Sequence, residues 1–554
     1  MSRSWGSQQV ERYRRRVRAE RGGMREALGA IETVRARVLA TMLAENEDTA
    51  FGREHRFKNI RGWKDFRAAV PIRDYAAHAP WIERAAAGER GVLSADEPVV
   101  YFTSSGTTGD RKKIPVTGEF MRTGFFPPFY AAWASLVERF PEVISREDST
   151  LNLKHDPVSR FPKTGSGHPH LGASQLDFGA AFGEPLAAEP GSRAPWGTLP
   201  VAMADDDHLG KAYVRLRLAA EHDVRCVIGI NPAMVAALPY QLEQWWPRLV
   251  RELRDGTVAG RHVGQANPGR AAELERLASA AGVLLPAHLW PNFQVIFCWT
   301  GGLASLYLPR LKECFGPDVT VLTAPIAASE GFVGVALDGS PDACEPAVGA
   351  AFHEFVDADV DLRQDSETVS FADLEPGREY HVVLSHVGGL YRYALGDVVS
   401  VADRHQGIPR LTYAGRNTLS DVAGERLRES HVVRALRRAL AASGREVHNA
   451  TCRPVTPSDG RPRYEFAVAA RETLRDDEAV RLAVGLDLSL TRLSDGYRLA
   501  RAAGRLDPAV VRVLEADAFQ RQWQARVADG VRPSQVKDRV FQRDDQAWRK
   551  LVKA

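Results

Sequence analysis

The chain has 554 residues, of which 44% are hydrophobic and 26% charged, with 46 glycines and 32 prolines. This length predicts two to four domains, and the composition is typical of a globular protein and excludes a low-complexity chain. The 73 basic residues nearly balance the 70 acidic ones, which excludes a strongly charged surface for nucleic acid or an anionic membrane. Any anionic ligand therefore needs local groups, and only 11 lysines are present to supply an ammonium.

The first predicted element is an amphipathic helix. Arginines are dense between residues 12 and 25, and apolar residues then recur at helical spacing from Leu28 to Met42. Acidic residues alternate with the arginines, so we interpret the basic face as solvated rather than as a nucleic-acid site.

The middle of the chain is predicted to alternate between strands and helices. Short apolar runs occur at residues 98–102 and 294–299, and a helical pattern at 303–314 precedes a third run at 319–322. The order strand, helix, strand predicts a βαβ unit with a parallel sheet. Such sheets bind ligands in the loops beyond the carboxyl ends of their strands.

The character of the chain changes near residue 425. The predicted elements around this point are a strand-like stretch at 380–401, an arginine-rich helix at 426–441, apolar runs at 447–455 and 464–469, a helix from Asp477 and a strand at 539–541. We therefore predict an α/β fold with a large N-terminal domain, residues 1–424, whose parallel or mixed sheets are flanked by helices. A smaller α+β C-terminal domain, residues 425–554, is expected to follow a hinge.

The five cysteines are odd in number and widely separated, which predicts neither a disulfide framework nor a zinc ribbon. The first residues lack the apolar core of a signal peptide, and no run of 18 apolar residues occurs. We expect a cytoplasmic protein that acts without nucleic acid or membrane, as a monomer or homodimer.

The strongest functional signal is a hydroxyl-rich loop after the run at 98–102. It reads Thr103-Ser104-Ser105-Gly106-Thr107-Thr108-Gly109-Asp110-Arg111-Lys112-Lys113. Its amides and hydroxyls can point at one anion, its glycines permit close approach, and two of the rare lysines end it. The pattern predicts a polyphosphate site, although it has neither the spacing of a P-loop nor that of a dinucleotide fingerprint.

Two further motifs carry an acid. Ala327-Ala328-Ser329-Glu330-Gly331-Phe332 follows the strand that ends near Thr323, and a carboxylate at the carboxyl end of a parallel strand is well placed to hold Mg²⁺. Gly388-Gly389-Leu390-Tyr391-Arg392-Tyr393-Ala394-Leu395-Gly396-Asp397 ends in an aspartate that could accept from both hydroxyls of a ribose.

Two weaker signals leave alternatives open. The aromatic stretch at residues 125–133 fits either a pocket for an aryl or alkyl acid or ordinary core packing. His168 and His170 have a spacing seen in metal sites, but no cysteine or aspartate cluster accompanies them, so we favour a surface loop.

Together the three motifs resemble the adenylate-forming superfamily, and within it the acyl acid amido synthetases of the Gretchen Hagen family. The resemblance extends over about residues 30–545 and includes the landmarks Asn46-Glu47-Asp48-Thr49-Ala50-Phe51-Gly52, Val70-Pro71-Ile72-Arg73-Asp74-Tyr75, Leu289-Trp290-Pro291-Asn292 and Phe352-His353-Glu354-Phe355. It implies an ATP- and Mg²⁺-dependent ligase. Such an enzyme activates a carboxylic acid as an acyl-adenylate with release of pyrophosphate, then transfers the acyl group to an amino acid or other amine with release of AMP.

The resemblance also implies roles for individual residues. Lys112, Glu330 and Lys537 are the expected catalytic residues: the lysine of the loop, the Mg²⁺ ligand, and a C-terminal lysine that swings over the phosphate. The expected nucleotide-binding residues are Ser104, Ser105, Gly106, Thr107 and Thr108 at the phosphates, Ser329 near the α-phosphate, and Tyr393, Asp397 and Arg416 at the nucleoside and hinge.

Some positions depart from the family pattern. Ile326 stands where an aromatic residue usually lies beside the adenine, Ala328 replaces a common serine, Arg111 stands where proline is frequent, and Arg426 replaces a hinge lysine. Two other functions therefore stay open, an acyl-CoA synthetase with the same adenylation step and a catalytically inactive nucleotide-binding module. The arginine-rich composition suggests a bacterial enzyme of specialised metabolism.

Overall fold

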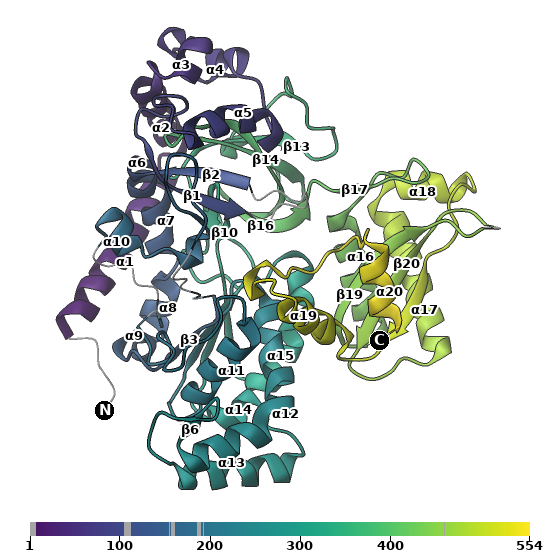
Figure 1. Cartoon of the computed structure of the whole chain (residues 1–554). Coiled ribbons are helices and arrows are strands. Elements are labelled where there is room, and N and C mark those ends of the chain that lie inside the picture. Colours follow the sequence, from purple (N-terminus) through teal and green to yellow (C-terminus); the bar gives the residue numbers. More distant parts are fainter. Residues whose placement is uncertain are drawn as a thin grey trace. The chain divides into compact units, whose positions relative to one another are not determined.

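Helices and strands mix throughout the chain, which has an α/β fold (Figure 1). The computed structural model describes residues 7–104, 112–154, 156, 161–184, 190–191, 193–458 and 460–553. The chain forms two units: unit 1 contains Met1–Ala194 and Leu322–Tyr413, and unit 2 contains Pro195–Val321 and Ala414–Ala554. The boundaries between these units lie after residues 194, 321 and 413 and not at residue 424. The division into domains 1–424 and 425–554 therefore remains a prediction.

Unit 1 begins with two helices, α1 (Ser7–Leu28) and α2 (Ile31–Asn46), where we predicted one. The helix breaks because Ala30 adopts a non-helical conformation after Gly29. The basic face of α1 is not simply solvated, since Arg21 pairs with Glu138 and the Arg16 guanidinium lies 4.8 Å from the ring centroid of Tyr130. The other helices of unit 1 are α3 (Ala50–Glu54), α4 (Trp63–Ala69), α5 (Tyr75–Ala86), α6 (Gly118–Phe120), α7 (Phe126–Ala131), α8 (Ala134–Arg139), α9 (Pro141–Ser145) and α10 (Phe178–Phe182).

The apolar run at 98–102 forms β1 (Pro98–Ser104), as predicted, and pairs with β2 (Lys112–Thr117) in an antiparallel hairpin. The short β4 (His170–Leu171) lies parallel to β1 on its other side. His170 is therefore a buried strand residue whose Nε2 lies 3.2 Å from the carbonyl oxygen of Lys112. The surface loop predicted for this histidine is wrong, because its neighbour Leu171 extends a buried sheet.

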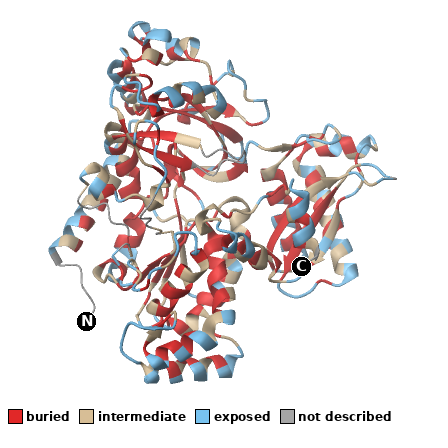
Figure 2. Ribbon diagram, in the orientation of Figure 1, coloured by how far each residue is buried: buried red, intermediate tan, exposed pale blue. Residues whose placement is uncertain are grey.

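Unit 1 also contains the short strand β3 (Thr150–Asn152) and two more antiparallel sheets. The strands of the first are β13 (Phe352–Asp357), β14 (Glu379–His386), β15 (Leu390–His405) and β16 (Ile408–Arg416), in that order. The second contains β10 (Ile326–Ala328), β11 (Gly331–Val335) and β12 (Glu345–Pro346). The strands are largely buried, whereas the helices are exposed on their outer faces (Figure 2).

The aromatic stretch at 125–133 packs as core. Phe125 lies 5.7 Å from Phe129, 5.5 Å from Phe178 and 5.3 Å from Phe332, measured between ring centroids. All four side chains are buried, and Phe332 on β11 connects this cluster to Glu330, two residues earlier in the same motif.

The first part of unit 2 contains the predicted strand–helix–strand sequence. β5 (Cys226–Ile228) pairs in parallel with β8 (Val295–Cys298), and β9 (Thr320–Thr323) is the next strand in the sheet. A 3₁₀ turn at Gly302–Tyr307 and α15 (Leu308–Phe315) connect β8 to β9, so the predictions for 294–322 are confirmed. The remaining elements here are α11 (His208–Ala219), α12 (Pro232–Asp255), α13 (Pro268–Ala281), α14 (Pro286–Leu289), β6 (Thr257–Val258) and β7 (Arg261–His262).

The C-terminal part of unit 2 is a three-layer structure around the sheet β19 (Val447–Val455), β20 (Arg463–Ala470) and β21 (Val510–Leu514). Alternate residues of β20 point to opposite faces: Phe466 and Val468 pack against α16 (Glu429–Ser443), α17 (Asp476–Leu493) and α18 (Asp495–Ala502), and Ala467 packs against α19 (Ala518–Ala528) and α20 (Asp545–Lys553).

Most C-terminal predictions are confirmed, but the strand at 539–541 is wrong. Only a single bridge joins Phe541 to Cys452 there. The five cysteines are free and buried. Among the described residues, no helix has the length and apolarity needed to cross a bilayer.

Candidate active site

The β1–β2 hairpin fixes the two ends of the hydroxyl-rich loop. Ser104 and Lys112 are partners in the register of the hairpin, so the loop leaves and re-enters the sheet at one point. The predicted phosphate-binding residues Ser105, Gly106, Thr107 and Thr108 lie outside the described residues. Lys112 is the first residue of β2, so its side chain lies at the end of that loop.

Three of the predicted site residues meet within unit 1, although they come from three distant segments. The ammonium of Lys112 donates to the Tyr393 hydroxyl (3.4 Å), which in turn donates to Oε1 of Glu330 (3.1 Å). The same ammonium lies 5.2 Å from the ring centroid of Tyr75. Cation, hydroxyl and carboxylate thus form one polar chain.

Glu330 lies in the turn between β10 and β11, which are antiparallel strands with Ala328 opposite Gly331. The predicted position at the end of a parallel strand is therefore wrong, because the hairpin β10–β11 intervenes after β9. The neighbouring Ser329 donates its hydroxyl to the Thr103 carbonyl (3.4 Å), which joins this turn to the end of β1.

The Glu330 carboxylate lies in an environment that favours a bound cation. Burial raises the pKa of Glu330, the Lys112 ammonium lowers it, and the charge of Asp397 raises it. Two carboxylates that interact in a buried site are stabilised by a positive charge between or beside them. Among the described residues, no three His, Cys, Asp or Glu side chains could hold a metal ion together. This donor set fits Mg²⁺, which uses one or two carboxylates and takes its other ligands from water and phosphate.

Two irregularities in β15 determine where its side chains point. Leu384 opposes Tyr393 and His386 opposes Leu390, so β15 has one extra residue here, and Arg392 has a φ of 45°. A second irregularity contains Gly396, whose φ of 80° suits glycine. Such bulges redirect side chains, frequently beside active sites. Here the first lies directly before Tyr393, and the second contains Asp397, which is buried.

A buried ion pair, for which we predicted no role from the sequence, holds the first irregularity in place. Nε of Arg392 donates to Oε2 of Glu354 (2.9 Å), and the two side chains are 1% and 0% exposed. Glu354 also accepts from Trp63 Nε1 (2.9 Å) and from the Thr368 hydroxyl (2.6 Å). Arg392 donates further to the carbonyl of Val70 (2.8 Å). The family landmark at 352–355 was the one sequence signal that could have indicated this pair.

Other landmark residues hold the same strand. The Arg73 amide donates to the Arg392 carbonyl (3.0 Å), and the Ala394 amide donates to the Arg73 carbonyl (2.8 Å). The Asn46 side chain donates to the Val387 carbonyl (3.1 Å) at the turn before β15. Three of the segments that carry the family resemblance thus bond to β15 or to the turn before it.

The last two predicted site residues belong to unit 2. Arg416 ends β16 and donates its amide to Oε2 of Glu429 (2.9 Å). The ammonium of Lys537 lies 5.0 Å from the ring centroid of Trp299. The neighbouring Asp538 accepts from the Tyr307 hydroxyl (2.5 Å), so the segment that carries Lys537 is anchored within its own unit.

Comparisons with known proteins identify the family of the chain. The family models of the GH3 family N-terminal, central and C-terminal domains match residues 22–320, 346–416 and 430–546. The probable indole-3-acetic acid-amido synthetase GH3.12 of Oryza sativa subsp. japonica is 28% identical over 436 residues, which cover 70% of this chain and 69% of that protein. The indole-3-acetic acid-amido synthetase GH3.3 of Arabidopsis thaliana is 24% identical, with 92% and 89% covered.

A solved structure of the GH3.15 acyl acid amido synthetase has the same fold, with a TM-score of 0.76 at 20% identity. The match covers 94% of this chain and 93% of that one. Sequence and structure comparisons therefore indicate the same relatives.

Removing one partner of the buried pair should destabilise unit 1 strongly. Arg392→Met leaves the Glu354 carboxylate buried without its cation, and we expect the unfolding free energy to fall by about 3–5 kcal/mol, measured by urea denaturation. Arg378→Met is the matched control, because it removes an exposed pair with Asp357 and should change the free energy of unfolding little. Equal effects of the two substitutions would contradict the role of the buried pair.

Proposed function

The chain belongs to the GH3 family, and we propose that it is an ATP-dependent ligase that adenylates a carboxylic acid and transfers the acyl group to an amine. Its relatives are named amido synthetases. The observation that carries the proposal for this chain is the contact of Lys112, Tyr393 and Glu330, which places the cation of the phosphate loop beside a buried acid.

A carboxylate does not react with an amine at neutral pH because oxide is a poor leaving group. Attack of the acid on the α-phosphorus of ATP forms an acyl-adenylate and expels pyrophosphate, and catalysis requires positioning and neutralisation of the developing phosphate charge. Lys112 supplies a cation at the end of the loop. Ser329 is placed beside the end of β1, where it can donate to a phosphate oxygen.

Tyr393 connects these groups, since its hydroxyl contacts both Lys112 and Glu330. It holds the ammonium near the carboxylate when no phosphate is bound. Asp397, which lies in the second bulge of the same strand, is the proposed acceptor for the ribose hydroxyls.

We assign Glu330 as the protein ligand of the Mg²⁺ ion that accompanies ATP. When bound, the ion supplies positive charge to the phosphates. This assignment agrees with the oxygen donor set and with the burial of the Glu330 carboxylate.

The second half-reaction transfers the acyl group from AMP to an amine and forms an amide. We propose that Lys537, on the anchored segment beside Trp299, supplies a cation in one half-reaction, while Arg416 supports the nucleoside near the hinge. The rotation of a small domain between the half-reactions is a common device in enzymes with two steps.

The activity is tested by pyrophosphate release in the presence of ATP, Mg²⁺ and a panel of carboxylic acids. We expect release that depends on the acid and is lost on chelation with EDTA. The panel should contain indole-3-acetic acid, because the relatives are named for it. Addition of amino acids or of CoA then identifies the acceptor by mass spectrometry.

The expected product is an amide. A thioester without any amide would identify an acyl-CoA synthetase instead, and nucleotide binding without pyrophosphate release would identify an inactive binding module. Either result contradicts the proposal.

The role of the polar chain is tested with Tyr393→Phe. Loss of a hydrogen bond to charged groups should slow pyrophosphate release roughly tenfold to a hundredfold. Tyr391→Phe is the control, since it removes an equally buried hydroxyl on the same strand that bonds to the Leu93 carbonyl instead. We expect this variant to keep the parent rate, and a shared loss of rate would point to general damage to β15.

The role of Lys537 is tested by measuring both half-reactions of Lys537→Ala. Loss of a catalytic cation should slow one of them by about a hundredfold or more, followed separately as pyrophosphate release and as amide formation from isolated acyl-adenylate. Lys550→Ala removes an exposed lysine of α20 and should change neither. If Lys537→Ala also changes neither, the assignment of this lysine is wrong.

A further inference from the structure

Helix α17 carries two apolar stripes on opposite sides. Leu482, Leu486 and Leu490 are buried and pack with α16 and the β19–β21 sheet. Val480, Val484 and Leu488 have the same four-residue spacing but are 63%, 54% and 54% exposed. The two stripes are offset by two residues, which corresponds to nearly opposite faces of a helix. A helix that is apolar on both sides is normally buried on both sides.

The neighbouring helix shows what an ordinary outer face looks like in this unit. The exposed positions of α16 include Arg434, Arg437 and Arg438. The outer face of α17 instead presents three aliphatic side chains in a row, and within the described residues nothing covers them. This difference marks α17 as an interaction surface.

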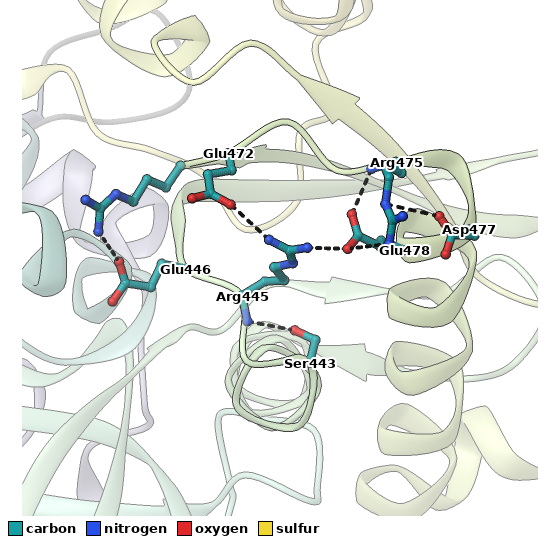
Figure 3. Close-up of polar contacts among 8 residues, drawn as sticks. Ser443, Arg445, Glu446, Glu472, Arg475, Asp477 and Glu478 are labelled. Atoms are coloured by element: carbon teal, nitrogen blue, oxygen red, sulfur yellow. Dashed lines mark hydrogen bonds and ion pairs between the residues drawn. The ribbon is translucent and has the colours of Figure 1, made fainter.

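Most charged residues near the N-terminus of α17 form one network of ion pairs (Figure 3). Arg445 pairs with Glu472 (3.1 Å) and with Glu478, while Arg475 lies 3.6 Å from Asp477. Asp476 is exposed and makes no ion pair with any described residue, and the same is true of Arg492 in the last turn. One free charge therefore lies at each end of the apolar stripe, negative at the N-terminal end and positive at the C-terminal end.

The order of these residues is self-complementary. Residues four apart advance by about 40° around a helix, so this row winds around α17. In an antiparallel pair of α17 helices that cross at about −50°, the angle at which such rows run alongside each other, with Val484 on the two-fold axis, Val480 meets the partner's Leu488 and Asp476 meets the partner's Arg492. Each apolar residue then contacts an apolar residue, and each free charge contacts the opposite charge. A two-fold interface requires this property, because the same patch serves both subunits.

We propose that the outer face of α17, defined by Asp476, Val480, Val484, Leu488 and Arg492, binds the same face of a second copy of this chain. The apolar centre supplies affinity, and the two charge pairs at the ends fix the antiparallel register. The interface is small, so the dimer dissociates on dilution.

Sedimentation velocity of the full chain over a range of concentrations tests the proposal. We expect a reversible monomer–dimer equilibrium. Val484→Lys places two ammonium groups against each other at the axis and should raise the dimer dissociation constant by about tenfold or more. Val360→Lys is the matched control, because Val360 is 53% exposed in unit 1, and it should leave the equilibrium unchanged.

Charge reversal tests the register. Asp476→Arg or Arg492→Asp alone places like charges together twice in each dimer and should weaken association by roughly threefold to tenfold. The double variant restores opposite charges in exchanged positions and should recover the parent affinity. Because all these side chains are exposed, the urea midpoint of each variant should match the parent.

Three outcomes would overturn the proposal. A chain that stays monomeric at every concentration excludes this partner and leaves α17 to a different protein. A dimer that Val484→Lys does not weaken uses another surface. A double charge reversal as weak as the single ones excludes the antiparallel register.

Discussion

The candidate site depends on the buried pair between Arg392 and Glu354. Two charges without solvent are costly unless hydrogen bonds satisfy their remaining atoms. Here Trp63 and Thr368 donate to the Glu354 carboxylate and the Val70 carbonyl accepts from Nη1 of Arg392, while Nη2 of Arg392 is buried without a partner among the described residues. The pair therefore permits only a small range of positions for the Arg392 side chain. It holds the backbone of Arg392 at a positive φ, which residues other than glycine rarely adopt. Since Tyr393 is the next residue, the pair determines the direction of the hydroxyl that joins Lys112 to Glu330.

This constraint explains why the family landmarks are so far apart in the sequence. Asn46, Arg73 and Glu354 bind no substrate in the proposed function, yet each bonds to β15 or to the turn before it. They hold one strand from three directions, and the strand then presents Tyr393 and Asp397. The family resemblance therefore includes residues that hold the site in place as well as residues proposed to act in the reaction.

The sequence predicted most strands because their apolar runs are local signals, as at residues 98–102 and 447–455. It could not predict the Arg392–Glu354 pair, because an arginine between two tyrosines in a strand has the pattern of an outward-facing residue. The hairpin β10–β11 was missed since its strands are only a few residues long, and the burial of His170 depends on pairing with β1. These features arise from contacts between distant segments, and for the site residues only the family resemblance carried that information.

The same contrast between local pattern and tertiary contact applies to α17. The sheet β19–β21 is already covered on one face by α16, α17 and α18 and on the other by α19 and α20. This three-layer arrangement has no further layer over the outer stripe of α17, and Val484 stays exposed among the described residues. Exposure of such a stripe is unfavourable in water. The stripe has a negative charge at one end and a positive charge at the other, so a second α17 in antiparallel orientation is complementary to it. The dimer surface thus follows from an apolar face that this three-layer part of the fold leaves uncovered.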